Sequence, residues 1–428
     1  MNVDLRLIQK YNVAAPRYTS YPPATHFVEM HGERKGSGEL SLYFHLPFCW
    51  QRCWYCGCTN VTTENQAASA EYIQYIRREL EITKPRKGPV VQLHLGGGTP
   101  TFLLPSEIEM LGKMIRSHFT LDEEVEASVE IDPRRLTREH VTALRGTGFQ
   151  RASIGIQDFD PAVQEAVHRM QSREQTQNAI KWLREAGFSS LNFDLIYGLP
   201  HQTAASFSKT LDEVIALRPE RLAVFNYAHV PWLKPTQNLL TALPSPEEKL
   251  ELLKLTVERL TTSGYIYIGM DHFALADDEL AIAQRKGTLQ RNFQGYSTRG
   301  NTDIYGFGMS AISQTADAYW QNVKDLAAYY KALDDGRSPI VKGYILTKDD
   351  QIRRKAIMQL MCNLYLDFNE YFAAEFASLD DLEADGLIAS TKNGITVTDL
   401  GRLLIRNIAV RFDKYFGKQT SVQFSRSI

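Results

Sequence analysis

Four of the five cysteines in this 428-residue chain lie within ten residues, directly after the strand-like run LYFHLP. They are Cys49, Cys53, Cys56 and Cys58. Disulfide frameworks spread cysteines along a chain so that they connect distant segments, whereas a cluster of this kind favours metal or redox-cofactor binding. The fifth cysteine, Cys362, stands in the apolar run IMQLMCNLYL and is predicted to be a buried core thiol.

The spacing within the cluster argues against a structural zinc site, which would need a second pair of cysteines or a histidine pair nearby. Ferredoxin-type clusters use four thiolates, with a remote or repeated fourth ligand. Three thiolates on one tight loop would instead hold a [4Fe–4S] cluster through three irons and leave the fourth iron open. An open iron is useful in a catalyst.

Composition excludes several classes of protein. The chain has 48 Lys and Arg against 50 Asp and Glu, a net charge of −2, so a general nucleic-acid or polybasic membrane surface is not expected. No run approaches the roughly 20 apolar residues of a membrane helix, and the N-terminus lacks the apolar region of a secretory signal. We therefore expect a cytoplasmic protein that binds neither nucleic acid nor membrane.

From Leu42 onward, strand-like runs alternate with helical patterns at the spacing of β–α units. Six or seven such units predict an α/β fold with a parallel sheet and crossover helices. The predicted strands cover residues 42–46, 90–95, 125–131, 151–156, 191–197, 221–227 and 265–270.

These strands carry polar residues at alternate positions, whereas parallel strands covered on both faces usually read as continuous apolar runs. A polar face repeated along five successive strands favours an incomplete barrel with a polar lumen, and predicts a site at the C-terminal strand ends. The residues concerned are Gln92, His94, Glu126, Ser128, Glu130, Asp132, Arg151, Ser153, Gln157, Asn192, Asp194 and Asn226.

Three regions are predicted along the chain. Residues 1–40 form an N-terminal extension and linker, 41–330 the barrel, and 331–428 a small, mostly helical domain of winged-helix type. Within the last, Asn393-Gly394 predicts a type I′ hairpin turn. We also expect residues 1–25 to fold over the barrel mouth as a lid, with Arg17 meeting a substrate carboxylate.

One β–α unit after the cysteines, Gly96-Gly97-Gly98-Thr99-Pro100 follows a predicted strand, and no Gly-Lys-Ser/Thr follows as a phosphate loop would require. The CxxxCxxC loop and this glycine turn together resemble the radical S-adenosylmethionine (SAM) enzymes. Over essentially the whole chain, the sequence resembles the oxygen-independent coproporphyrinogen III oxidases. The segments that carry this resemblance include PRYTSYPPA, LYFHLPFCWQRCWYCGCT, QLHLGGGTPT, GIQDF, NFDLIYGLP, RNFQGYSTRGNTD and LGRLLIRNI.

The resemblance implies an incomplete (β/α)6-type radical SAM barrel and a defined reaction. The family converts two propionates of coproporphyrinogen III into vinyl groups, giving protoporphyrinogen IX, with a 5′-deoxyadenosyl radical from SAM. The enzyme would be a coproporphyrinogen dehydrogenase, an oxidoreductase of CH–CH groups in haem biosynthesis. It would use a [4Fe–4S] cluster, one or two SAM molecules and a low-potential donor such as flavodoxin or ferredoxin, and would be a monomer.

The resemblance also assigns residues. Cys49, Cys53 and Cys56 match the cluster ligands, and Cys58 matches an extra cysteine that is not a ligand. The matches to contacts of the cluster-bound SAM are Tyr43, Gly97, Glu130 and Ile312, and Glu130 joins the three cysteines as a catalytic residue. The matches to contacts of a second SAM are Tyr55, Gly98, Thr99, Gln157, Arg169, Asp194 and Ala228. That second SAM is either a co-substrate or occupies space meant for the porphyrinogen.

Three alternatives use the same motifs differently. A haem-binding chaperone would keep the cluster and SAM without decarboxylation, and a radical SAM methyltransferase would methylate haem. A DNA-binding regulator would use the C-terminal region with an iron–sulfur sensor, but the chain lacks the basic stripe that this function needs.

Overall fold

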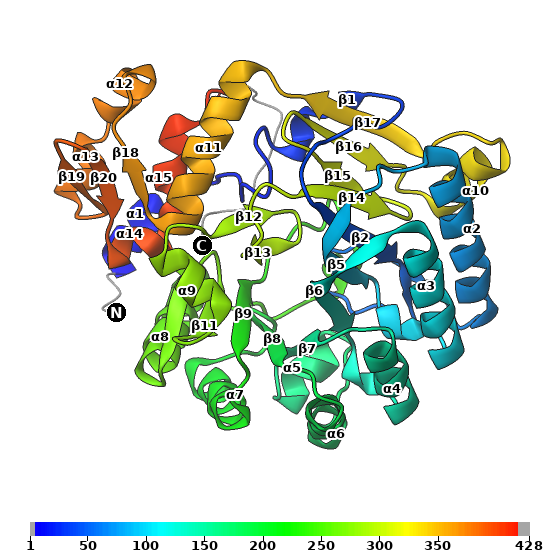
Figure 1. Cartoon of the computed structure of the whole chain (residues 1–428). Helices are drawn as coiled ribbons and strands as arrows, with labels where there is room; N and C mark the ends of the chain where they lie inside the picture. The colour runs from blue at the N-terminus through cyan, green and yellow to red at the C-terminus, as the bar shows by residue number, and fades with distance from the viewer. Residues whose placement is uncertain (1–4, 418–428) are drawn as a thin grey trace.

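The computed structural model describes residues 5–417, which surround one curved sheet of 13 strands (Figure 1). Its centre is a run of parallel neighbours that bends into an open barrel. In spatial order these are β14 (Asp303–Phe307), β2 (Leu40–Leu46), β5 (Pro89–Gly97), β6 (Thr120–Ile131), β7 (Arg151–Gln157), β8 (Ser190–Tyr197) and β9 (Arg221–Asn226). The prediction of an incomplete α/β barrel is confirmed.

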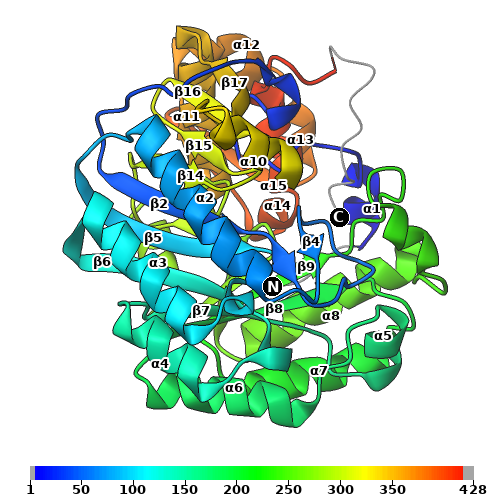
Figure 2. The ribbon, with the colours of Figure 1, turned by 90° about the vertical axis from the view of Figure 1, so that its right-hand side faces the viewer.

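Crossover helices cover the outer face of the parallel strands (Figures 1 and 2). They are α2 (Ala67–Thr83), α3 (Pro105–His118), α4 (Arg138–Gly146), α6 (Arg173–Glu185), α7 (Ala204–Leu217) and α8 (Pro246–Thr262), with the short α5 (Pro161–Ala166) after β7. Several begin at a Ser or Thr whose hydroxyl accepts a backbone N–H three residues on, as Thr137 and Ser172 do. In β7, Ala152, Ile154 and Ile156 are buried against these helices, so the alternate residues face the lumen.

Antiparallel strands extend the sheet at both edges. On one side lie β15 (Ile312–Gln314), β16 (Ala318–Asn322), β17 (Ile340–Ile345) and β1 (Val28–Glu29), with α10 (Leu326–Asp334) between β16 and β17 in the chain. On the other side, β11 (His272–Leu275) pairs antiparallel with β9, and β10 (Tyr265–Gly269) pairs antiparallel with β11.

The expectation that residues 265–270 form a further parallel β–α unit is therefore wrong. Met270 and Asp271 have positive φ angles of 44° and 73°, and this tight turn reverses the chain directly into β11. No crossover helix separates the two strands, so the pair closes the sheet as an antiparallel hairpin. The helix α9 (Glu279–Arg285) and the hairpin β12 (Gln290–Asn292)–β13 (Gly295–Ser297) follow.

Beyond α11 (Lys348–Asn363), a three-stranded sheet is formed by β18 (Tyr365–Asp367), β20 (Gly394–Val397) and β19 (Ile388–Thr391). The short helices α12 (Ala373–Phe376), α13 (Asp380–Ala384), α14 (Asp399–Leu403) and α15 (Ile405–Ala409) complete this region. The winged-helix interpretation of this region stays a prediction.

The hairpin is present, but its type I′ turn at Asn393-Gly394 is wrong. Thr391 pairs with Gly394, so the turn is Lys392-Asn393, and neither of these residues has the positive φ that type I′ requires. Gly394 has another role, because a Cβ there would lie 2.2 Å from the Leu366 carbonyl oxygen of β18.

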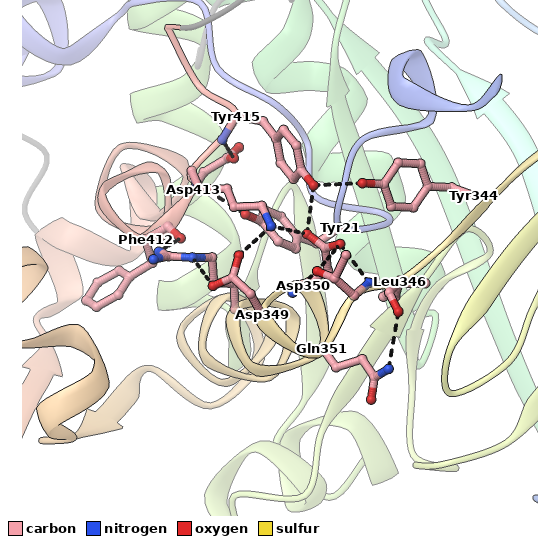
Figure 3. A network of polar contacts seen from close by, with 12 residues as sticks. Tyr21, Tyr344, Leu346, Asp349, Asp350, Gln351, Phe412, Asp413 and Tyr415 are labelled. Carbon is pink, nitrogen blue, oxygen red and sulfur yellow. Dashed lines mark hydrogen bonds and ion pairs between the residues drawn. The ribbon is translucent and has the colours of Figure 1, made fainter.

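The N-terminal segment packs against the C-terminal region. Its helix α1 (Leu5–Tyr11) contacts the loop after α13 through a hydrogen bond of 2.5 Å from the Tyr11 hydroxyl to Asp385. Figure 3 shows Tyr415 beside Asp350 at the start of α11, where the Tyr415 hydroxyl donates to Asp350 at 2.8 Å and the Lys414 N–H donates to the Tyr21 hydroxyl at 3.2 Å. The expected boundaries at residues 40 and 330 stay predictions.

Candidate active site

A cavity of about 480 Å³ occupies the inside of the barrel. Its wall contains the polar residues that alternate along the strands, except for Asn226. In β9 the cavity is lined by Arg221, Ala223 and Phe225, so Asn226 belongs to the opposite register and its prediction as a lumen residue is wrong. The predicted polar lumen is otherwise confirmed.

The four clustered cysteines enter this cavity on the loop that follows β2. The short parallel pair β3 (Phe48–Cys49) and β4 (Val61–Thr62) closes the base of the loop. Within it, the Cys56 N–H donates to the Cys53 carbonyl at 3.1 Å, which brings these two residues together. Cys49, Cys53, Cys56 and Cys58 all line the cavity.

Each of the three predicted ligands has a polar neighbour at its sulfur. The Cys49 Sγ is 3.5 Å from the Thr99 hydroxyl, and the Cys53 Sγ accepts from the Arg169 guanidinium at 3.5 Å. The Cys56 Sγ accepts the backbone N–H of Cys58 and the Asn60 amide, both at 3.4 Å. Hydrogen-bond donors around thiolate sulfurs are a general feature of iron–sulfur sites.

The electrostatics of the loop separate Cys56 from Cys58. Hydrogen bonding to Cys58 lowers the pKa of Cys56 to about 6, so Cys56 is the thiolate of this pair. The same contact raises the pKa of Cys58. Burial raises the pKa of the Cys49 thiol to about 12.

The donor set fits a cluster better than a single ion. Across residues 5–417, no group of three or more His, Cys, Asp or Glu side chains is arranged to hold one metal ion. A [4Fe–4S] cluster takes one sulfur on each of three irons, so its ligands stand further apart than those of a mononuclear site. Cys49, Cys53 and Cys56 are the residues that would hold it.

The glycine turn after β5 lies directly against the cysteine loop. The Gly98 N–H donates to the Leu46 carbonyl and the Thr99 N–H to the Phe48 carbonyl, both at 2.8 Å. A Cβ at Gly98 would lie 2.3 Å from the Pro47 carbonyl oxygen, so only glycine allows this approach. Gly97 has a φ of 121° and directs its N–H toward Glu130.

Glu130 stands at the end of β6 within a chain of polar contacts. It accepts the Gly97 N–H at 3.1 Å and contacts the His94 ring nitrogen at 3.4 Å, while His94 also contacts the Ser128 hydroxyl at 2.6 Å. Burial alone would raise the pKa of Glu130, but the His94 and Gly97 contacts outweigh it and lower that pKa. Glu130 is therefore an anion prepared to accept from amino or hydroxyl groups of a ligand.

A second charged group joins the end of β6 to the cysteine loop. Asp132 accepts from Arg169 at 3.0 Å and from Arg134 at 2.6 Å. The Arg134 guanidinium also lies 3.7 Å from the Cys53 Sγ. The alternating pattern predicts Asp132 on the lumen face but gives no signal for Arg134, which lies in a short turn between β6 and α4.

Asp194 lies further along the same wall, in β8. It accepts from the Ser153 hydroxyl and the Asn192 amide, each at 2.8 Å. Burial raises the pKa of Asp194 to about 7, and the charge of Glu130 adds to this effect. Gln157, at the end of β7, has a φ of 70° that turns it out of the strand register into the cavity wall.

Three of the predicted SAM contacts do not line the cavity. Tyr43 stacks on His94, with ring centroids 5.8 Å apart. Ala228 is joined to Tyr55 through the Gln237 amide, which donates to both backbone carbonyls, at 3.3 Å and 3.0 Å. Ile312 begins β15, opposite Gln321 of β16. The remaining predicted contacts line the cavity: Tyr55, Gly97, Gly98, Thr99, Glu130, Gln157, Arg169 and Asp194.

The β12–β13 hairpin adds wall residues that sequence reasoning left without a role. Asn292, Gln294, Tyr296 and Ser297 line the cavity. They lie within RNFQGYSTRGNTD, whose three-residue strands are too short to produce a readable alternation.

Among the described residues, no helix is long and apolar enough to cross a membrane.

Comparisons with known proteins agree with this arrangement. The Radical SAM superfamily profile matches residues 43–214, and the HemN C-terminal domain profile matches residues 346–404. The first match implies a [4Fe–4S] cluster and SAM as the cofactors. Oxygen-independent coproporphyrinogen III oxidases from Synechocystis and Escherichia coli are both 46% identical over 99% of this chain, covering 97% and 98% of those proteins.

A solved structure gives the same answer. Coproporphyrinogen III oxidase from Escherichia coli, described as a radical SAM enzyme, superposes with a TM-score of 0.91 and 44% identity, over 97% of this chain and all of the other. This chain belongs to the oxygen-independent coproporphyrinogen III oxidase family of radical SAM enzymes.

Proposed function

We propose that this protein converts two propionate side chains of coproporphyrinogen III into vinyl groups, giving protoporphyrinogen IX. Each conversion removes one hydrogen atom, one CO2 and one electron from a propionate, and the electron passes to an external one-electron acceptor. When bound, the cluster and SAM supply the 5′-deoxyadenosyl radical that takes the hydrogen atom. The observation that carries the proposal is the single cavity that joins Cys49, Cys53 and Cys56 to Glu130, Arg169 and Asp194.

The protein's own residues bind and orient the reactants. Cys49, Cys53 and Cys56 hold the cluster, and the glycine turn with Glu130 offers acceptors beside it. Glu130 is anionic and adjacent to the turn, so we assign it to the amino or ribose hydroxyl groups of SAM. Tyr43 supports this arrangement by stacking on His94, which contacts Glu130.

A second group of residues lies further from the cysteine loop along the wall. We propose that Gln157, Asp194 and Tyr55 contact either a second SAM or the porphyrinogen in the same space. Asp194 is suited to donate a hydrogen bond as well as accept one, because its pKa of about 7 keeps a large protonated fraction at neutral pH. Thr99 and Arg169 connect the second group of residues to the cysteine loop, because Thr99 contacts the Cys49 Sγ and Arg169 donates to the Cys53 Sγ.

We also propose a cytoplasmic monomer that receives electrons from a low-potential carrier such as flavodoxin or ferredoxin. Reduction of a low-potential cluster requires a donor of that kind.

The direct test is an anaerobic assay of the reconstituted enzyme with SAM, a reductant and coproporphyrinogen III. We expect protoporphyrinogen IX, CO2 and 5′-deoxyadenosine. A stable stoichiometric haem complex without decarboxylated product would support a chaperone instead, and methylated haem would support a methyltransferase.

A further inference from the structure

His272 begins β11, on a part of the cavity wall that the sheet separates from the glycine turn. In the sheet, β7, β8 and β9 lie between β11 and β6, which carries Glu130. Ala223 and Phe225 of β9 and Tyr296 of β13 line the cavity beside His272. This wall therefore lies apart from the residues that we assign to the cluster-bound SAM, and it is open to the other reactant.

The orientation of the His272 ring is fixed by its neighbours. Its Nδ1 lies 2.7 Å from the Met270 carbonyl oxygen. The rings of Phe225 and Tyr296 meet it at interplanar angles of 89° and 85°, with centroids 5.9 Å and 5.2 Å away. Because a carbonyl oxygen only accepts, Nδ1 carries the ring proton and donates it to Met270. The lone pair of the neutral ring is then on Nε2.

His272 is neutral on this wall. Burial, followed by the charge of Arg291, lowers the pKa of His272 to about 4. Asp271 acts in the opposite direction, but its carboxylate is paired with Arg17 at 2.7 Å. At neutral pH the ring therefore carries no second proton, and Nε2 can only accept a hydrogen bond.

The Nε2 atom is accessible from the cavity, and no group within residues 5–417 donates to it. Two of its neighbours on the wall are engaged within the protein. The Tyr296 hydroxyl donates to the Met361 carbonyl at 3.1 Å, and the Asn292 Oδ1 accepts the Gln294 N–H at 2.8 Å. His272 thus presents an unused acceptor, held in one orientation, to whatever fills this part of the cavity.

A porphyrinogen has the complementary chemistry. Each of its pyrrole nitrogens carries a hydrogen, so the ring nitrogens are all donors. The saturated carbon bridges let the pyrroles tilt, and an N–H can then point out of the face of the macrocycle. The oxidised porphyrin is planar, and its N–H groups point into its own centre. Only the reduced macrocycle can therefore donate to a side chain that lies against its face.

We propose that the His272 Nε2 accepts a hydrogen bond from a pyrrole N–H of the porphyrinogen, and that this contact selects the porphyrinogen over the oxidised porphyrin. This inference rests on the proposed function, which supplies the substrate. His272 exchanges no proton in this role, so it is a positioning and specificity residue. Its contact would hold the macrocycle against the β9–β11 wall while the propionates reach toward the cysteine loop.

The test measures the Kd of coproporphyrinogen III and of coproporphyrin III for the anaerobic, cluster-loaded protein. S-adenosylhomocysteine replaces SAM, so that no radical forms and the porphyrinogen stays intact. Ultrafiltration separates free from bound ligand, and fluorescence after oxidation gives both amounts. We expect the wild type to prefer the porphyrinogen. His272→Asn should raise the Kd of the porphyrinogen about threefold to tenfold and change that of the porphyrin less than about twofold, because one neutral hydrogen bond is lost.

Two substitutions separate the nitrogens of the imidazole. In His272→Asn, the amide can still donate to the Met270 carbonyl, but no atom replaces Nε2. In His272→Gln, the longer side chain can place its amide oxygen near the Nε2 position, so the preference for the porphyrinogen should be kept.

The matched control is His140→Asn. His140 is a buried histidine of α4, outside the cavity, whose Nε2 lies 3.0 Å from the Leu103 carbonyl oxygen. This variant should lower the thermal unfolding midpoint and leave both Kd values unchanged. The iron content of every variant reports whether the cluster site has folded.

The outcomes separate this inference from the proposed function. Equal affinities of the wild type for the two ligands would overturn the inference, and so would an equal rise of both Kd values in His272→Asn. Turnover by the wild type with an unchanged porphyrinogen Kd in His272→Asn would overturn the inference and leave the function standing. Porphyrinogen binding that depends on His272, without turnover by the wild type, would overturn the function alone. If His272→Asn does not fold, His272→Phe takes its place with the same expected results.

Discussion

The Arg169 guanidinium bridges Asp132, at 3.0 Å, and the Cys53 Sγ, at 3.5 Å. One side chain after β7 thereby fixes both a strand end of the barrel and a residue of the cysteine loop. Arg134 repeats the connection, since it also pairs with Asp132 and lies 3.7 Å from the Cys53 Sγ. Two positive charges beside one predicted cluster ligand have consequences for the cluster.

Replacing Arg134 by Met should make the reduction potential of the cluster more negative. A positive charge and an N–H near the Cys53 sulfur both stabilise the reduced cluster, which carries the extra electron. The substitution removes both of them, so reduction becomes less favourable. Potentiometric titration followed by EPR would measure the shift. Arg135→Met is the control, because the Arg135 guanidinium lies over the Trp50 ring, 4.7 Å from its centroid, and has no sulfur contact in the described structure. Equal potentials in both variants would contradict the assignment.

Cys58 should be dispensable for cluster assembly. Cys58→Ser is expected to retain about four irons per chain, whereas Cys49→Ser, Cys53→Ser and Cys56→Ser should each lose most of the cluster. Iron analysis after anaerobic reconstitution, with the cluster's visible absorption, measures this. If Cys58→Ser lost as much iron as Cys56→Ser, the assignment of three cysteines as ligands and Cys58 as a non-ligand would be wrong.

Gly98→Ala should weaken SAM binding by about tenfold or more, because a strained turn must shift to relieve the contact with Pro47. The Cβ would lie 2.3 Å from the Pro47 carbonyl oxygen. Gly57→Ala is a matched control within the cysteine loop, since its Cβ would meet nothing within 4 Å. Equilibrium binding of SAM to the reconstituted proteins gives the comparison. Similar Kd values for the two variants would exclude a role for this close approach.

Glu130→Gln should reduce SAM affinity by about tenfold to a hundredfold, because a charged hydrogen-bond acceptor is lost while its volume is kept. The Gly97 N–H at 3.1 Å would remain close to a side-chain oxygen, so the turn should hold. The same binding measurement applies, with iron content as the control for folding. Unchanged affinity would assign Glu130 to structure alone.

Glu79 should make stability depend on pH. This buried residue of α2 accepts from the Tyr329 hydroxyl, the Asn322 amide and the Gly308 N–H, at 2.6, 2.6 and 2.7 Å. Burial nevertheless raises the pKa of Glu79 from 4.5 to about 7. The folded state therefore holds the proton more tightly than the unfolded state between these two values.

The stabilisation from Glu79 is complete below pH 4.5 and is lost as pH rises through about 7. Glu79→Gln cannot titrate, so its stability should fall less across this window. Urea unfolding of the two proteins over the pH range gives the difference. Parallel pH profiles would show that Glu79 does not carry this dependence.

The sequence was sufficient for the barrel and for most of its lumen. Period-two polar residues on β5 to β8 identify the cavity wall, because alternation in a parallel strand requires a hydrated or liganded face. The sequence pattern was insufficient at Asn226, because the apolar end of that strand does not show which positions face the lumen. It was also insufficient at residues 265–270, because the Met270-Asp271 turn that follows decides the direction of the next strand. In both places, residues outside the strand determine its orientation or its partner.

The site was predictable where one segment carries the chemistry. Cys49, Cys53, Cys56 and the Gly97-Gly98 turn are local motifs, and the structure brings them together. Arg134 was not predictable, because its role depends on Cys53, a residue distant in the chain. Long-range electrostatic neighbours leave no periodic signal in a sequence.

The central claim is that a radical formed in this cavity takes a hydrogen atom from the substrate's propionate. Coproporphyrinogen III deuterated at the propionate carbon attached to the pyrrole tests it directly, with mass spectrometry of the 5′-deoxyadenosine. We expect one deuterium in each 5′-deoxyadenosine and two labelled 5′-deoxyadenosine molecules for every protoporphyrinogen IX. Protoporphyrinogen IX formed with unlabelled 5′-deoxyadenosine, or labelled substrate left intact while SAM is cleaved, would contradict it.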